Sequence, residues 1–392
     1  MLVSKRLQQI SPSLTMAMST KARELQRQGV QVLSFTIGEP DFDTPQHIKE
    51  AAIVAINQGF TKYTDTSGIP ELKHAIIEKF KKDNNLTYTP ENILVGNGVK
   101  QCLYNIFQAI VNPKDEVLIP IPYWVSFSEM VKLAEGKCIF LPCNDNFKID
   151  KQTLQKHLTK KTKALILNSP SNPTGAVYNE SELADIAQIC VENNIIVISD
   201  EIYEKLIYEG KHYSIASLND KIKQLTIVFN GVSKTYAMTG WRIGYCAGDT
   251  EIIKAASRLQ DHTTGNPNSI AQKAAIAALT GPQESVKTMV EEFKKRRDYM
   301  VNRLNSIKQI KVKKPDGAFY VFPDVSKLYN SEIPDSVSFC KKLLDEYFVA
   351  VVPGSAFGDD RCIRVSFAVS LETIKMGLDR IKEFTFLLCG EN

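Results

Sequence analysis

The sequence predicts an α/β fold with a large domain, built on a mainly parallel seven-stranded sheet between helices, and a smaller α+β domain formed by the two chain ends. Short apolar runs recur through the middle of the chain, and helical stretches separate most of them. This alternation is typical of a parallel sheet that helices cover on both faces. The length agrees, because 392 residues exceed what one hydrophobic core usually organises.

The first part of the chain, residues 1–45, is predicted to be the N-terminal segment of the small domain. Residues 13–29 have the periodicity of an amphipathic helix that Gly29 closes, and residues 30–37 are extended. A turn-forming loop with the sequence Gly-Glu-Pro-Asp-Phe follows at 38–42.

The large domain is predicted to span residues 46–283. It begins with helices at 47–58 and 70–82, and the second has proline at its first turn, a position that favours helix formation. An irregular polar loop at 62–68 joins them. The seven predicted strands are 93–95, 116–120, 137–141, 164–168, 195–199, 225–229 and 243–247. An alanine-rich helix at 270–280 is expected to be buried.

The pattern changes after Gly281-Pro282, and residues 284–392 are predicted to be the C-terminal part of the small domain. A long charged helix at about 284–306 leads into this part. Its predicted strands are 319–322, 349–352 and 363–367, and its predicted helices are 336–346 and 371–386.

The composition excludes several classes of function. Basic and acidic residues are interspersed around a formal charge of +4, so no nucleic-acid-binding face or polybasic membrane segment is expected. No apolar run approaches the roughly 20 residues of a membrane span, and no apolar signal core follows the start. The eight cysteines form no Cys-x-x-Cys pair, which favours reduced thiols in a cytoplasmic protein. The five histidines show no metal-ligand spacing, so no metal is expected.

One lysine, Lys234, follows the predicted buried strand 225–229 within a segment of small and polar residues. Burying an ammonium group is costly unless it is paired or neutral, and a desolvated lysine becomes a nucleophile toward carbonyls. Arg242, eight residues later, carries the planar fork that suits a phosphate. Together they favour an aldehyde that carries a phosphate, and pyridoxal phosphate fits that description.

Other informative residues also follow predicted strands, where parallel α/β sheets bind their ligands. Gly98 lies in a turn that opens a helix, whose amide groups could hold a phosphate. Trp124 could stack on a planar ring, Asn172 lies between two prolines, and Asp200 ends a buried strand and needs a partner. Taken singly, each has a structural alternative: a solvated lysine, a tight turn, a core tryptophan or a positioned loop.

The whole set resembles the signature of fold-type I, class I aminotransferases, which use pyridoxal phosphate. The matching motifs are Asn-Pro-Thr-Gly at 172–175, Ser-Asp-Glu-Ile-Tyr at 199–203, Ser-Lys with Arg-Ile-Gly at 233–244, the loop at 38–42, and Arg364. Segments 123–126 and 237–242 are most similar to the gamma subgroup of bacterial aspartate aminotransferases. The resemblance covers nearly the whole chain, with the motifs in the family's order.

The resemblance implies three catalytic roles. Lys234 would carry the cofactor and move the proton, Asp200 would keep the pyridine nitrogen protonated, and Tyr203 would hydrogen-bond the phenolic oxygen. The other implied cofactor residues are Asn172 at the same oxygen, Trp124 stacked on the ring, and Gly98, Val99, Lys100, Ser233, Arg242 and Tyr63 near the phosphate. The implied substrate residues are Arg364 as the α-carboxylate clamp, with Asn172, Trp124, the backbone of Gly38, and Lys100 for a distal carboxylate.

The resemblance also implies a homodimer with shared active sites, because it places Tyr63 at the phosphate of the neighbouring subunit's cofactor. The chain departs from the family pattern at two positions. Gly231 stands where many members have a phosphate-binding serine, and Ser233 could take part of that role. Val99 occupies a position often held by glycine or alanine, which is tolerable if only its backbone contacts the phosphate.

The implied function is a ping-pong transfer of an amino group between aspartate or glutamate and a 2-oxo acid such as oxaloacetate or 2-oxoglutarate. Alternatives are a preference for aromatic or neutral amino acids, a related lyase, and a non-catalytic regulator. A regulator would need a fused DNA-binding module, and the helix before Gly29 is too short for one. Ser11 stands where close relatives that accept prephenate have a basic residue, which disfavours that extension.

Overall fold

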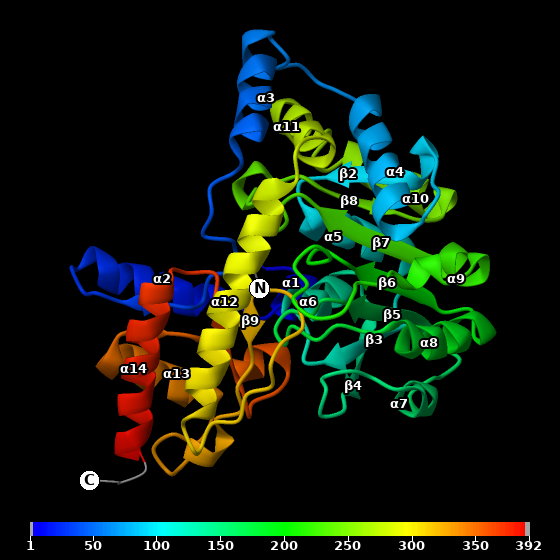
Figure 1. The fold of residues 1–392 in the computed structure, drawn as a ribbon. Helices are drawn as coiled ribbons and strands as arrows, with labels where there is room; N and C mark the ends of the chain where they lie inside the picture. Colours follow the sequence, from blue (N-terminus) through cyan, green and yellow to red (C-terminus); the bar gives the residue numbers. More distant parts are fainter. Residues whose placement is uncertain (1–2, 389–392) are drawn as a thin grey trace.

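The computed structural model describes residues 3–388 and contains the predicted seven-stranded sheet (Figure 1). Its order is β2-β8-β7-β6-β5-β3-β4. The strands are β2 (Ile93–Gly96), β3 (Glu116–Ile121), β4 (Lys137–Pro142), β5 (Thr162–Asn168), β6 (Ile196–Asp200), β7 (Thr226–Gly231) and β8 (Gly244–Ala247). The pairs of β8 with β2 and β7 are antiparallel and the other pairs of this sheet are parallel, so the prediction of a mainly parallel sheet is confirmed.

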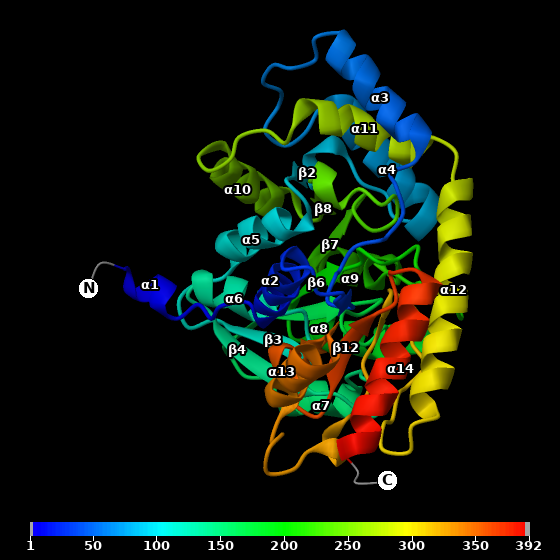
Figure 2. The ribbon, with the colours of Figure 1, turned by 90° about the vertical axis from the view of Figure 1, so that its left-hand side faces the viewer.

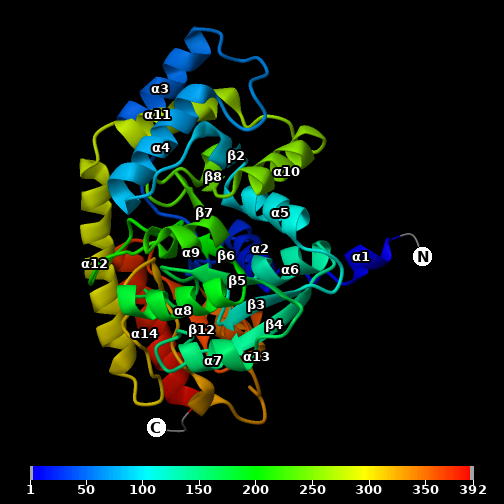
Figure 3. The same ribbon diagram turned by 90° about the vertical axis from the view of Figure 1, so that its right-hand side faces the viewer.

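Helices cover both faces of the sheet because its central strands are apolar on both faces. Ile166 and Ile198 pack against α5 (Val99–Ile110), α6 (Ser126–Leu133) and α10 (Thr250–Asp261). The alternate residues, Leu165 and Val197, pack against α7 (Lys151–Lys156) and α8 (Glu180–Glu192). Figures 2 and 3 view the molecule from opposite sides and show the two helix layers.

A further group of helices packs at the β2 and β8 end of the sheet. It comprises α3 (Gln46–Asn57), α4 (Pro70–Asn84) and α11 (Ser269–Thr280). The short helix α9 (Asp220–Leu225), before β7, packs instead against α8. Buried alanines of α11 contribute to the core there, as its composition predicted. The polar loop between α3 and α4 lies at this end of the molecule (Figure 1).

The two chain ends meet beside this sheet. In the N-terminal part, β1 (Leu33–Ser34) pairs in parallel with β10 (Val349–Ala350), close to α2 (Leu14–Arg27). The strands β9 (Tyr320–Val321), β11 (Val352–Pro353) and β12 (Ile363–Ser366) form a small antiparallel sheet. The helices α13 (Ser336–Tyr347) and α14 (Leu371–Leu388) pack here, and α12 (Glu284–Asn305) runs from α11 into this region (Figure 1).

Some strands of this smaller region differ from expectation. The strand predicted at 349–352 is two strands, since β10 pairs with β1 while β11 belongs to the sheet of β12 and β9. The strand predicted at 319–322 is limited to β9, and only β1 is strand within the extended segment 30–37. The domain boundaries at 45/46 and 283/284 stay predictions, although α12 does begin at Glu284.

Seven cysteines are free thiols in the described part of the chain, and Cys389 lies outside it. Across residues 3–388, no helix combines the length and the apolar character that a membrane crossing requires.

Candidate active site

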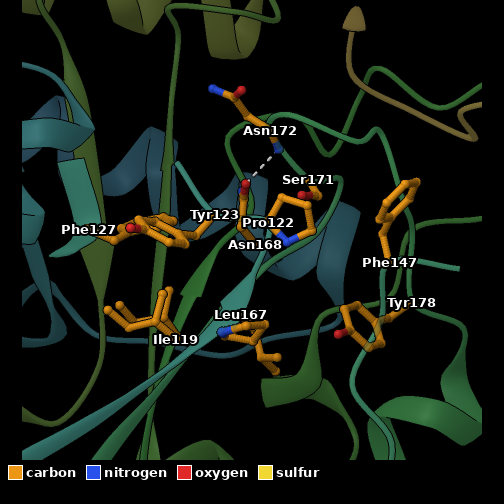
Figure 4. Close-up of a pocket in the computed structure, with 12 residues that line it drawn as sticks. Ile119, Pro122, Tyr123, Phe127, Phe147, Leu167, Asn168, Ser171, Asn172 and Tyr178 are labelled. Atoms are coloured by element: carbon orange, nitrogen blue, oxygen red, sulfur yellow. Dashed lines mark hydrogen bonds between the residues drawn. The ribbon is translucent and has the colours of Figure 1, made fainter. Parts of the chain in front are cut away.

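Several site residues follow neighbouring strands of the large sheet. Asn168 and Asp200 end β5 and β6 and are register partners, and Asp200 is in turn the partner of Phe229 in β7. Because the carboxyl ends of parallel strands share one edge of a sheet, the loops that carry Asn172 and Lys234 start at that edge. Figure 4 shows a pocket there, in which the backbone N–H of Asn172 donates a hydrogen bond of 2.8 Å to the side-chain oxygen of Asn168.

Lys234 lies between the large sheet and the chain ends. Its ammonium donates a hydrogen bond to the carbonyl of Gly38, and its Nζ lies 6.0 Å from the ring centre of Tyr203 and 5.9 Å from that of Phe319. Burial lowers the pKa of Lys234 to about 8, against an opposing effect of Glu39. Roughly a tenth of this amine is therefore neutral at pH 7, and the neutral form is the nucleophile toward a carbonyl.

Asp200 is a buried acid, 4% exposed. Its carboxylate accepts a hydrogen bond of 3.2 Å from the Ile202 amide, and within residues 3–388 no lysine or arginine lies within ion-pair distance of it. Burial raises the pKa of Asp200 to about 7. A cationic ligand group beside it, such as a protonated pyridine nitrogen, would return this carboxylate to its charged form.

Arg364 is 3% exposed and connects two distant segments. Its Nη1 donates to the Asn172 side chain at 3.1 Å, and its Nη2 donates to the carbonyl of Thr36 at 2.7 Å. Its Nε is buried without a partner, and no acid within residues 3–388 forms an ion pair with Arg364. Burial lowers the pKa of this guanidinium. A buried cation without a counter-ion is a suitable site for a ligand carboxylate.

The predicted phosphate turn lies at the start of α5. Gly98 has φ of 80°, a conformation that favours glycine, and a Cβ atom there would collide with the guanidinium of Arg242. That guanidinium donates to the carbonyls of Thr239 at 2.9 Å and Asn97 at 3.2 Å. The helix N-terminus and the guanidinium thus form a cradle of N–H donors, which suits a phosphate.

The two departures from the family pattern have structural explanations. A Cβ atom on Gly231 would lie 3.0 Å from the Cα of Gly244 and 3.1 Å from the carbonyl of Ile243, so a serine would not fit without a backbone shift. The side chain of Val99 packs against core residues, which leaves its backbone for the cradle. Ser233 is buried beside Lys234, and its contact with a phosphate stays a prediction.

Other predicted residues lie at the rim or outside this cluster. Lys100 is exposed, and its Nζ lies 4.9 Å from the ring centre of Trp124. Partial burial and the nearby Arg242 lower the pKa of Lys100. Tyr63 is 98% exposed on the loop between α3 and α4, and the fold of one chain does not bring it to the other predicted residues.

Sequence reasoning missed Tyr320 and Thr36. Tyr320 lies in β9, its hydroxyl is 3.0 Å from that of Tyr203, and its ring lies under the guanidinium of Arg364. The aromatic run 319–322 was the available signal, but such runs in a strand are also typical of a hydrophobic core. Thr36 contributes only its carbonyl, for which a sequence carries no signal.

Known proteins match this chain over nearly its whole length. The aspartate aminotransferase of Bacillus sp. (strain YM-2) is 51% identical over 387 residues, which cover 98% of this chain and 99% of that protein. A probable aspartate/prephenate aminotransferase of Rickettsia typhi is 45% identical over 97% of this chain and 98% of its own length.

Solved structures agree with the sequence matches. The structure of the Thermus thermophilus aspartate aminotransferase with maleate has a TM-score of 0.93 at 43% identity, and the match covers 97% of this chain and 99% of that chain. The family model described as "Aminotransferase class I and II" matches residues 30–381, which include the lysine, the strand-end residues and the arginine described above. The chain therefore belongs to the class I and II aminotransferase family.

Proposed function

We propose that this protein is an aspartate aminotransferase. It moves an amino group between aspartate or glutamate and a 2-oxo acid, oxaloacetate or 2-oxoglutarate, in a ping-pong reaction that uses pyridoxal phosphate on Lys234. The observation that carries the proposal is the guanidinium of Arg364, which is buried beside Asn172 and, within residues 3–388, has no acidic partner and no hydrogen bond at its Nε. An α-carboxylate bound by this fork would supply the missing negative charge.

The residues present fit pyridoxal phosphate. Lys234 offers a buried amine with a lowered pKa, and Asp200 is a buried acid that lacks the cation a pyridinium would supply. Gly98, Val99 and Arg242 offer the phosphate cradle. When bound, the cofactor supplies the electron-withdrawing ring that acidifies the substrate Cα proton. Lys234 would then move that proton, while Tyr203 and Asn172 hold the phenolic oxygen.

Lys100 is our candidate for the distal carboxylate of an acidic substrate. It lies in the first turn of α5, whose N-terminus forms part of the phosphate cradle, and no acid pairs with it within residues 3–388. The comparison structure from Thermus thermophilus contains maleate, a dicarboxylate, which agrees with an acidic ligand in a related site. The aromatic ring of Trp124 lies beneath this ammonium. Because of this ring, the proposal also includes aromatic amino acids as a secondary group of substrates.

We also propose that the protein works as a homodimer. Tyr63 is 98% exposed, and Ile53, Val54 and Ile56 on nearby α3 are each more than half exposed. Apolar side chains grouped in this way mark a contact surface more often than a solvated one. A second copy docked here could bring its Tyr63 to the cofactor phosphate, and sedimentation of active protein as a dimer is the expected result.

The experiment is a panel of half-reactions with aspartate, glutamate, alanine, phenylalanine and tyrosine. The holoenzyme should lose its visible absorption band when the amino donor is added alone, fastest with aspartate or glutamate. A lyase would release product and keep the band, and a preference for phenylalanine or tyrosine would reject the acidic substrate. Arg364→Leu is the matched variant: it should keep the band of bound cofactor and lose most of the reaction with every donor.

A further inference from the structure

Tyr320, which the sequence analysis missed, lies at the centre of the candidate active site. It is fully buried in β9, directly across the ladder from Ser366 in β12, so it shares a face of the small sheet with Arg364 two residues earlier. Its ring centre lies 4.4 Å from the guanidinium carbon of Arg364. This distance is that of a close cation–π contact.

The hydroxyl of Tyr320 makes a second connection, to the cofactor side of the site. It lies 3.0 Å from the hydroxyl of Tyr203, a hydrogen bond in which either oxygen could donate. It also lies against Gly38, because a Cβ atom on that glycine would be only 2.9 Å from it. One side chain therefore touches the cofactor-facing tyrosine, the substrate-facing arginine and the N-terminal segment.

The direction of the hydrogen bond follows from counting protons. A phenol has one O–H to donate. When Tyr203 donates to the phenolic oxygen of the cofactor, it has none left for Tyr320, so the bond at 3.0 Å must run from Tyr320 to the Tyr203 oxygen. An oxygen that accepts one hydrogen bond becomes a stronger donor in the next.

We propose that Tyr320 is a positioning residue with two separable actions. Its hydroxyl donates to Tyr203 and strengthens the hydrogen bond from Tyr203 to the cofactor, and its ring holds the Arg364 guanidinium in place for the substrate carboxylate. The inference rests on the proposed use of pyridoxal phosphate and on Arg364 as the carboxylate clamp.

Tyr320→Phe tests the hydroxyl. A donor at the cofactor's phenolic oxygen stabilises the form with more negative charge there, which is the deprotonated form. The variant should therefore raise the pH at which the visible band changes by roughly 0.2–0.6 unit. In a Tyr203→Phe background the same substitution should add nothing, because its route to the cofactor is gone. Tyr245→Phe, at a buried tyrosine outside the site, is the matched control and should not shift the band.

The ring is tested with maleate as a non-reacting dicarboxylate. Tyr320→Phe should bind it as tightly as the wild type, whereas Tyr320→Leu should bind it roughly 3–30-fold more weakly. Because the leucine variant could fold poorly, its circular dichroism and dimer fraction are measured first, and the phenylalanine variant tests the hydroxyl independently.

The outcomes separate this inference from the proposed function. If the wild type shows no visible band or no half-reaction, the proposed function fails. If the wild type shows both, an unshifted band in Tyr320→Phe, or an equal shift in the Tyr203→Phe background, overturns the hydroxyl's role. Unchanged maleate binding by folded Tyr320→Leu overturns the role of the ring.

Discussion

The short segment from Asp200 to Glu204 supplies buried acids to two regions that treat charge in opposite ways. Asp200 and Tyr203 belong to the proposed active site, where burial raises the pKa of Asp200 to about 7. Glu204, 6% exposed, faces a second region, where Lys79 forms an ion pair with it and Asn84 donates to it at 2.9 Å. There burial acts to raise the pKa of Glu204, but the combined effect of Lys79, His212 and Lys205 outweighs it and lowers the pKa to about 2.

The difference is not one of burial but of partners. Glu201, between them, is also satisfied: its carboxylate accepts from Ser199 at 2.8 Å, Ser214 at 2.7 Å and His212 at 3.0 Å. Asp200 and Arg364, by contrast, have no charged partner in the described chain. A buried charged group without an oppositely charged partner indicates a ligand-binding site, whereas a buried charged group with such a partner indicates a structural role.

This distinction also explains a cluster that could be mistaken for a metal centre. Glu201, Glu204 and His212 offer ligand atoms that lie within 4.8 Å of one another. The ammonium of Lys79 already pairs with Glu204, so the protein supplies its own cation at this place. We assign the cluster to the structural region.

The largest expected effect comes from removing the lysine of the proposed active site. Lys234→Ala should lower turnover of aspartate with 2-oxoglutarate on the order of 10⁴-fold or more, because both the covalent attachment and the proton transfer depend on this amine. Its urea midpoint should not fall, since a poorly paired buried cation is removed. A variant that kept near-normal turnover would contradict the assignment of Lys234.

In the region of Lys79 and Glu204, a substitution is expected to reduce the stability of the fold. Lys79→Met leaves the Glu204 carboxylate buried without its cation, and should lower the free energy of unfolding by about 3–5 kcal/mol. The measurement is urea denaturation of the purified protein.

Lys205→Met is the control for this loss. It removes a more exposed lysine, paired with Asp83 at 2.9 Å, and should cost about 0–1 kcal/mol. Equal losses in the free energy of unfolding of the two lysine variants would show that the ion pair of Lys79 and Glu204 stabilises the protein no more than a surface ion pair does.

Asp200 and Glu204 should make the stability of the protein change with pH in opposite directions. In cofactor-free protein, Asp200 binds its proton more tightly when folded than when unfolded. Its contribution to stability is therefore present below about pH 4 and is lost as the pH rises to about 7, by up to about 4 kcal/mol. Asp200→Asn should remove this loss, as urea titrations across pH 4 to 8 would measure.

Glu204 should show the opposite dependence. Its folded pKa lies below its unfolded value, so its contribution is present above about pH 4.5 and is lost as the pH falls toward about 2. In a plot of the free energy of unfolding against pH, Glu204→Gln should reduce the slope below about pH 4.5 and leave the slope between pH 4.5 and 7 unchanged. If both variants altered the slope in the same pH range, the contrast between the two regions would be wrong.

The smallest expected effect is at the exposed rim of the active site. Lys100→Ser should reduce the preference for aspartate over alanine in kcat/KM by about fivefold, since a partly solvated charge contributes about 1 kcal/mol. Turnover of alanine should be unaffected. An unchanged preference would assign recognition of the distal carboxylate to another residue.

Much of the fold and several site residues could be predicted from the sequence, because their signals are local. Apolar runs report strands within a few residues, and the strands near Asp200 and Lys234 lie where the pattern placed them. A charged residue directly after a buried strand is visible in the sequence, and parallel topology then places these residues at one edge. These steps need no knowledge of distant contacts.

The tertiary structure alone decided which of these charged groups are paired and which remain open. Glu204 and Asp200 look alike in the sequence, yet only Glu204 meets a lysine, from a helix about 120 residues earlier. Tyr320 meets Tyr203 across 117 residues, and Arg364 meets Asn172 across 192. The pKa of a buried group is set by neighbours within a few ångströms, and packing of distant segments chooses those neighbours.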